Sequence, residues 1–175
     1  MGQIKKKKEW KKEPGTMRVK GCFRVNIVDP DGTIAGDSGW CDNTFTTAGH
    51  LNLLVNNMLT CLTSARLFGE YITLGTGTGP ASNEATLNGQ MVNKYIAVTN
   101  NTASTGASTA STLEMRATFT SAEIAASGNV RNIGFVWAAN TATTAGTLLC
   151  GSTFASSQWN TNQSVNCSYQ IRFAG

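Results

Sequence analysis

The segment 47–62, TAGHLNLLVNNMLTCL, constrains the fold more than any other part of this chain. Its apolar residues recur at the spacing that places them on one side of an α-helix, namely Leu51, Leu54, Val55, Met58, Leu59 and Leu62. Thr47 is suited to cap the first free amides of this helix, and Phe45 to pack over its first turn. A single helix with one apolar side needs a surface to cover, so we expect it to pack against a sheet.

Strand-like alternation surrounds this helix. Residues 19–28, VKGCFRVNIV, alternate apolar and polar side chains, Asp-Pro-Asp-Gly then predicts a turn, and 33–40 returns as the second arm of a hairpin. The other predicted strands are 71–74, 91–99, 112–120, 130–138 (apolar enough to be central), 148–154 and 163–173, while the low-complexity segment 100–111 is expected to be an exposed loop or a hairpin tip. The pattern predicts a mainly β fold, an antiparallel β-sandwich of jelly-roll or immunoglobulin-like type with the helix packed on it.

Charge divides the chain into two parts. Residues 1–20 hold eight Lys or Arg and two Glu, a net charge of +6, whereas the remaining residues hold six basic and eight acidic side chains, a net charge of −2. We therefore expect a basic N-terminal arm, 1–16, followed by a single β-sandwich domain, 17–175, whose near-neutral surface does not predict nucleic-acid binding. The arm cannot bury enough apolar surface to fold alone. It is either a solubilising tail or a segment that becomes ordered on a partner, and in the second case its contacts are Ile4, Lys5, Lys6, Lys7, Lys8, Trp10, Lys11 and Lys12.

The amino-acid composition indicates in which kind of compartment the protein is assembled. Charged residues make up only 14% of the chain, against about a quarter in a typical protein. The polar residues are mostly Thr, Ser and Asn, as is common in extracellular and virion β-proteins. Five cysteines without metal-ligand spacing, and no secretory leader at the N-terminus, favour reduced thiols in a protein assembled in a cytoplasm. No run of 18 apolar residues is present, so we expect no membrane contact.

The sequence predicts no catalytic, cofactor or metal site, and we do not expect an enzyme. His50 is the single histidine, the acidic residues do not pair as in glycosidases, and the Gly75-Thr-Gly-Thr-Gly79 stretch lacks the pattern of a phosphate loop. The arm is the remaining functional candidate, because clustered lysines bind polyanions through counterion release. That polyanion is either nucleic acid, contacted non-specifically, or an acidic patch on a neighbouring protein.

Three segments together carry a resemblance. YITLGTGTGPASNEATLNG, 71–89, is similar to the ALGTGTTAPAATDTAL type of segment in virion proteins of tailed bacteriophages, and FTSAEIAASGNVRNIGFVWA, 119–138, resembles its companion, in which a strand ending in Phe-Thr leads through a turn to an I-R-E-I-G-L-F strand. The hairpin FRVNIVDPDGTIAGDSGW, 23–40, also fits such proteins. Asn132 stands where the companion segment usually has an acid.

The resemblance implies a phage virion structural protein located in the virion. We expect a capsid decoration, minor capsid or tail component that forms a homo-oligomer, with a trimer favoured, and docks through its arm onto major capsid or tail proteins. Exposed tryptophans are the expected anchors: Trp10, Trp40, Trp137 and Trp159. The alternative is a receptor- or carbohydrate-binding head of a tail fibre, whose contacts lie in or near the loops 76–90, 100–111 and 139–147: Trp159, Thr76, Thr78 and Asn101.

Overall fold

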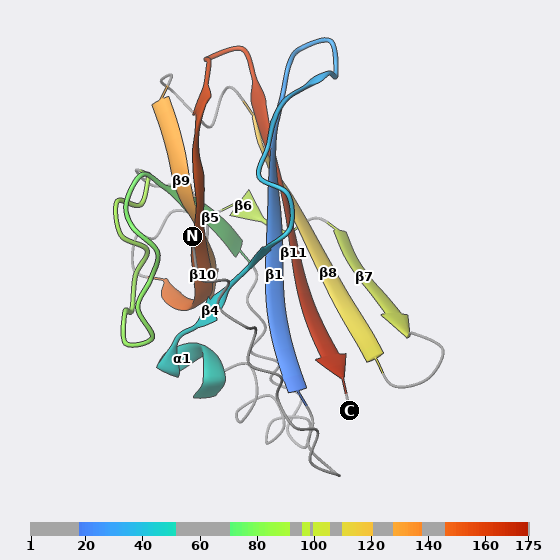
Figure 1. Ribbon diagram of the computed structural model, residues 1–175, viewed down its shortest axis with the longest axis vertical. Coiled ribbons are helices and arrows are strands. Elements are labelled where there is room, and N and C mark those ends of the chain that lie inside the picture. The colour runs from blue at the N-terminus through green and yellow to red at the C-terminus, as the bar shows by residue number, and fades with distance from the viewer. Residues whose placement is uncertain are drawn as a thin grey trace, which may run out of the picture.

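The computed structural model describes residues 18–51, 71–91, 96–98, 100–105, 110–120, 128–137 and 146–174 of the 175-residue chain. These residues form two antiparallel sheets that face each other (Figure 1). Sheet A has the order β2-β1-β11-β8-β7, with the short β3 also paired to β1, and sheet B has the order β4-β10-β9-β5-β6. The predicted mainly β, sandwich-like architecture is confirmed.

The strands of sheet A are β1 (Arg18–Val28), β2 (Ile34–Asp37), β3 (Cys41–Asp42), β7 (Asn100–Thr105), β8 (Ala110–Phe119) and β11 (Ser164–Ala174). Those of sheet B are β4 (Thr44–Phe45), β5 (Tyr71–Gly75), β6 (Ile96–Ala97), β9 (Gly128–Trp137) and β10 (Thr147–Trp159). The predicted hairpin after residue 28 is confirmed, with Gly32 at a φ of 88° in its turn. Segment 100–105, read from sequence as a loop or a hairpin tip, is the edge strand β7, which pairs with β8.

Alternation places the core as the sequence predicted in sheet A. Phe23, Val25 and Ile27 of β1 are buried, and so are the alternate residues of β11 and β8 that face sheet B, namely Val165, Cys167, Tyr169, Ile171, Met115, Ala117 and Phe119. In sheet B, β9 lies between β10 and β5, which confirms it as a central strand. An alternating pattern of apolar and polar residues is not expected in such a strand, because both of its faces are covered.

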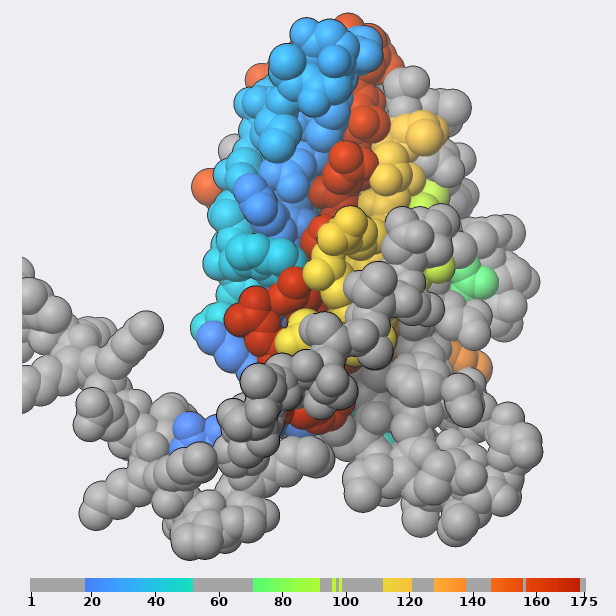
Figure 2. Space-filling model, turned by 90° about the vertical axis from the view of Figure 1, so that its right-hand side faces the viewer, coloured from blue at the N-terminus to red at the C-terminus, as the bar shows by residue number. Residues whose placement is uncertain are grey.

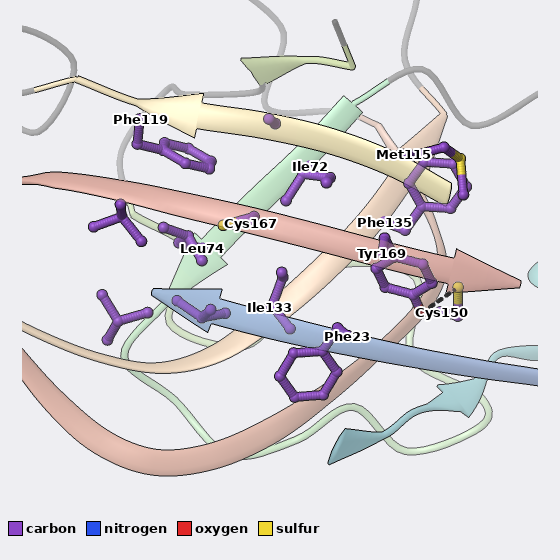
Figure 3. Close-up of a cluster of buried hydrophobic side chains, with 14 of the residues drawn as sticks. Phe23, Ile72, Leu74, Met115, Phe119, Ile133, Phe135, Cys150, Cys167 and Tyr169 are labelled. Atoms are coloured by element: carbon purple, nitrogen blue, oxygen red, sulfur yellow. Dashed lines mark hydrogen bonds between the residues drawn. The ribbon is translucent and has the colours of Figure 1, made fainter. Parts of the chain in front are cut away.

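A stacked aromatic pair joins the two sheets. The rings of Tyr169 from sheet A and Phe135 from sheet B are 5.3 Å apart between centroids. The Tyr169 hydroxyl donates a hydrogen bond of 2.8 Å to the sulfur of Cys150 (Figure 3). This bond provides a partner for a phenol that is fully buried, where an unpaired hydroxyl would be destabilising.

The segment after β3 crosses from sheet A to sheet B and begins the helix α1 (Thr47–Gly49). Thr46, and not Thr47, caps this helix: its hydroxyl accepts a 2.9 Å hydrogen bond from the Gly49 amide and donates to the Leu148 carbonyl oxygen at 2.6 Å. The prediction chose the wrong threonine because only the fold shows that Thr46 is buried against β10. As expected, Phe45 lies over the first turn, with its ring centroid 5.7 Å from that of His50.

The structure tests only the start of the predicted helix 47–62, because residues 52–62 lie outside the described ranges. Leu51, which was placed in the apolar stripe, is 52% exposed, so its side chain does not face the sheet. Gly49, in contrast, lies directly on sheet B. A Cβ atom at Gly49 would be 1.7 Å from the Leu149 carbonyl oxygen. This close approach fixes α1 against β10.

We expect Gly49→Ala to lower the free energy of unfolding by about 1–3 kcal/mol, the range for overpacked sites. Helix propensity alone predicts the opposite sign, since alanine is favoured over glycine by about 1 kcal/mol. The matched control is Gly36→Ala in β2, where a Cβ would make ordinary contacts of 3.6 Å with Ile27. Denaturant unfolding of both variants measures the difference, and a stabilised Gly49→Ala protein would contradict the close packing of α1.

Candidate functional site

Polar side chains cover much of the outer face of sheet A. Figure 2 shows β1 in blue, β11 in red and β8 in yellow side by side on this face, in agreement with their pairing. The residues that point outward alternate with those of the core, and among them are Arg18, Lys20, Arg24, Asn166, Arg172, Glu114, Arg116 and Thr118. This is the largest array of charged side chains that the described residues form on one face.

A chain of side-chain hydrogen bonds crosses this face from β11 to β8. Arg172 donates to the side-chain oxygen of Gln170 at 2.6 and 3.1 Å, and the Gln170 amide donates to Glu114 at 2.9 Å. Arg116 donates to the other oxygen of Glu114 at 2.7 Å. Partial burial opposes ionisation of Glu114, but the bonds from Arg116 and Gln170 outweigh it and lower the pKa of the carboxyl.

Like charges meet at the end of this face where β1 begins. Lys20 of β1 and Arg172 of β11 are direct register partners. Trp40, 44% exposed, lies beside Arg172, whose guanidinium is 6.0 Å from its ring centroid. Arg18 is two residues from Lys20 on the same side of β1. We call Arg18, Lys20, Trp40 and Arg172 the arm-end patch, because residues 1–16 precede β1 at this end.

The predicted arm contacts themselves cannot be placed. Ile4, Trp10 and the six lysines between residues 5 and 12 all lie outside the described residues. What the structure adds is the point at which the arm joins the domain: Arg18 pairs with Ala174, the last residue of β11, and Figure 1 shows the two strand ends together. The aspartate-containing turn between β1 and β2 lies at the opposite end of the sheet.

Trp159 is wrongly predicted as an exposed sugar platform or anchor. It is only 2% exposed and belongs to the main core cluster. The reason is a register irregularity in β10 between Thr153 and Ser157, which changes the side of the strand on which later residues lie. Of the other expected anchors, Trp40 and Trp137 are exposed, at 44% and 38%, and Trp10 lies outside the described residues.

The remaining predicted loop contacts have different surroundings. Thr76 and Thr78 are exposed, but both belong to a well-packed loop: the Thr76 amide donates to the Gly89 carbonyl oxygen at 2.9 Å, and the Thr78 hydroxyl accepts from the Asn88 side chain at 3.2 Å. Asn101 lies in β7, and its side chain is not among those described. The structure therefore does not bring the predicted contacts together as one site.

The loop 76–91 covers the outer face of sheet B, shown in green in Figure 1. Leu87 enters a second buried cluster with Tyr71, Val136 and Leu148 from three strands. Gly134 allows this contact, because a Cβ there would lie 2.7 Å from the Leu148 side chain and 3.4 Å from that of Leu87. The Leu148 amide also donates to the Ala85 carbonyl oxygen at 2.8 Å. Apolar packing and backbone hydrogen bonds thus hold the loop in place.

Asn132 fastens the two ends of this loop together. Its side-chain amide donates to the carbonyl oxygens of Thr78 and Asn88, each at 2.8 Å, and the residue is fully buried. Its side-chain oxygen points at Gly75, where a Cβ would lie 2.3 Å from it. An ionised acid at this position could donate neither bond, which explains why an amide suits this chain.

The described residues give little support to nucleophilic or metal chemistry. Burial raises the pKa of the Cys150 thiol to about 12, although the bond from Tyr169 acts in the other direction, and burial raises the pKa of Cys167 further. Cys22, Cys41, Cys150 and Cys167 are free thiols, and no three described His, Cys, Asp or Glu side chains gather as metal ligands. His50 is an exposed residue at the end of α1.

Comparison with known proteins adds no relative. No protein-family model matches the chain, and no curated protein or solved structure shows significant similarity to it. Within the described ranges, none of the helical structure is long and apolar enough to cross a bilayer. The function therefore has to be argued from the surfaces described above.

We expect Asn132→Ala to lower the free energy of unfolding by about 1–3 kcal/mol, since it removes a fully buried amide that donates to the carbonyl oxygens of Thr78 and Asn88. It should also speed proteolytic cleavage within 76–91. The matched control is Asn129→Ala, an exposed position three residues earlier on β9. Denaturant unfolding and timed proteolysis with peptide mapping measure both effects, and equal behaviour of the two variants would contradict the role of Asn132.

The Arg24–Asp37 ion pair predicts a pH effect on stability. The hydrogen bond from Arg24, followed by that from the Gly39 amide, lowers the pKa of Asp37 from 3.8 to about 2. Because the folded-state pKa is lowered, this contribution is fully present above about pH 4 and is lost as the pH falls towards 2. As the pH falls from about 4 to 2, the free energy of unfolding should decrease by about 0.2–1 kcal/mol more in wild type than in Asp37→Asn, the range for exposed ion pairs. Denaturant unfolding at several pH values measures this. A difference in the free energy of unfolding between wild type and Asp37→Asn that stays constant with pH would contradict the prediction.

Proposed function

We propose that this protein is a non-enzymatic structural component of a tailed-phage virion, a capsid decoration, minor capsid or tail protein that self-associates and docks through its basic N-terminal arm. The observation that carries the proposal is the arrangement of the charges. β1 begins at one end of sheet A, in the basic arm-end patch, and in the sequence it is preceded by a segment with six lysines. The segments that resemble virion proteins, 71–89 and 119–138, supply the docked loop and part of sheet B.

The chemistry of the domain is consistent with this role. Its described thiols are mostly buried, its single histidine is exposed at the end of α1, and its loop 76–91 is packed onto sheet B. The glycan-binding alternative has lost its aromatic platform, since Trp159 is in the core. We therefore favour binding to other proteins through the domain surface and the arm, with Trp40 and Trp137 as exposed aromatic anchors.

The test is incorporation into particles. Changing Lys5, Lys6, Lys7 and Lys8 together to Gln removes four positive charges from the full chain, and we expect incorporation to fall at least about fourfold, given about 0.2–1 kcal/mol per exposed charge contact. Changing the same four residues to Arg is the matched control and should preserve incorporation. Quantitative mass spectrometry of purified virions measures copy number, and light scattering on the isolated protein measures oligomeric state.

Two outcomes would contradict the proposal. One is full incorporation of the Gln variant, which would exclude docking through the arm. The other is a strictly monomeric protein that is absent from purified particles. Glycan-array binding by the isolated protein, lost on substitution of Thr76 or Thr78, would favour the fibre-head alternative.

A further inference from the structure

Two dipeptides in the described part of the chain join an exposed Asn or Asp to a glycine in the left-handed region. Asp31-Gly32 lies in the turn between β1 and β2, with Gly32 at a φ of 88°. Asn88-Gly89 lies in the loop 76–91, with Gly89 at a φ of 62°. In such a dipeptide the glycine amide nitrogen can attack the side-chain carbonyl carbon, Cγ, because glycine has no Cβ that obstructs the approach.

Hydrogen bonds oppose this attack in the turn between β1 and β2. The Gly32 amide donates to the carbonyl oxygen of Asp29 at 2.9 Å. The Asp31 carboxylate accepts two bonds from Thr33, one from its amide at 2.9 Å and one from its hydroxyl at 2.7 Å. Both the attacking nitrogen and the group that it would attack are therefore held in other contacts.

The second dipeptide has fewer such bonds. Among the residues that the structure describes, none accepts a hydrogen bond from the Gly89 amide. The Asn88 side chain donates to the Thr78 hydroxyl at 3.2 Å, a long bond on an exposed residue. Ring closure between the Gly89 nitrogen and Asn88 Cγ therefore breaks fewer contacts than the same step at Asp31.

The backbone of Asn88 lies at a close contact within the loop 76–91. Its carbonyl oxygen accepts a hydrogen bond of 2.8 Å from the Asn132 side chain. A Cβ atom at Gly77 would lie 2.4 Å from this oxygen and 2.7 Å from the carbonyl carbon. The preceding residue, Leu87, is buried in the second core cluster. A main chain that is longer by one CH₂ group at residue 88 would therefore be overpacked between these contacts.

We propose that Asn88 is a site of spontaneous covalent modification, and that one of its products releases the loop 76–91 from sheet B. The Gly89 nitrogen bonds to Cγ of Asn88, and its proton passes to the side-chain amide, which leaves as ammonia. The product is a succinimide ring, which water opens without oxidation or reduction.

The two carbonyl groups of this ring give two products. Water attack at Cγ gives aspartate, which keeps the original backbone and whose carboxylate accepts a hydrogen bond from Thr78. Water attack at the backbone carbonyl carbon gives isoaspartate, whose main chain runs through Cβ and Cγ and is longer by the CH₂ group that the packed loop does not accommodate. The reaction is measured on the isolated protein, so its failure and that of virion docking are separate results.

The first experiment incubates the full-length protein at near-neutral pH in oxygen-labelled water and maps its peptides by mass spectrometry. Opening of the succinimide introduces one labelled oxygen at the residue that reacted. The rate in the folded protein divided by that in the unfolded chain should be at least about fivefold higher for Asn88 than for Asp31, the factor that one retained hydrogen bond provides. Thr78→Val should raise the rate at Asn88 about twofold or more. The matched control, Thr86→Val at an exposed position of the same loop, should leave it unchanged.

The second experiment is timed proteolysis of the isoaspartate form, purified from the incubated protein by chromatography. It should be cleaved within 76–91 at least about fivefold faster than the unmodified protein, because cleavage follows the population of the open loop. Asn88→Asp encodes the other product and is the matched control, with cleavage at about the unmodified rate. Thermal unfolding establishes that each protein is folded. Equal rate ratios at Asn88 and Asp31 would overturn the assignment of the site, and equal cleavage of the isoaspartate and Asn88→Asp proteins would overturn the release of the loop.

Discussion

The pairing of the first strand with the last is the constraint on which this sandwich depends. β1 and β11 pair along their whole length, from Arg18 with Ala174 to Val28 with Ser164. This ladder places Phe23 and Tyr169 in the core and forms the centre of the polar outer face. It also decides that the arm joins the domain beside the end of β11. A weaker pairing would affect the core, the patch and the position of the arm together.

Strand alternation predicted much of sheet A, because each of its strands has one covered and one exposed face. It failed where the register changes or where both faces are covered. Trp159 follows an irregularity in β10, so no periodic pattern links it to the strand predicted at 148–154. The choice between Thr46 and Thr47 as the helix cap likewise depends on burial against Leu148 and Leu149, which are about a hundred residues away in sequence.

The candidate site was less accessible to sequence reasoning than the fold. Net charge alone described the domain as near neutral, and the opposing positions of Lys20 and Arg172 become visible only through the register of β1 and β11. Alternation did place Arg172 on the outer side of its strand, which was the available signal. In the same way, 76–90 was recognised as a loop, but its contact with sheet B requires partners from three separate strands.

The geometry of the β1–β11 ladder has a mechanical consequence. A load carried by the arm enters the domain at Arg18, at one end of this ladder. If the body is held at the same end, near Ala174, the hydrogen-bonded pairs open one after another, as in a zipper. If the body is held near Ser164, at the other end of β11, the same pairs are sheared together and share the force. The position at which a partner holds the domain therefore determines how much force the pairing of β1 with β11 can withstand.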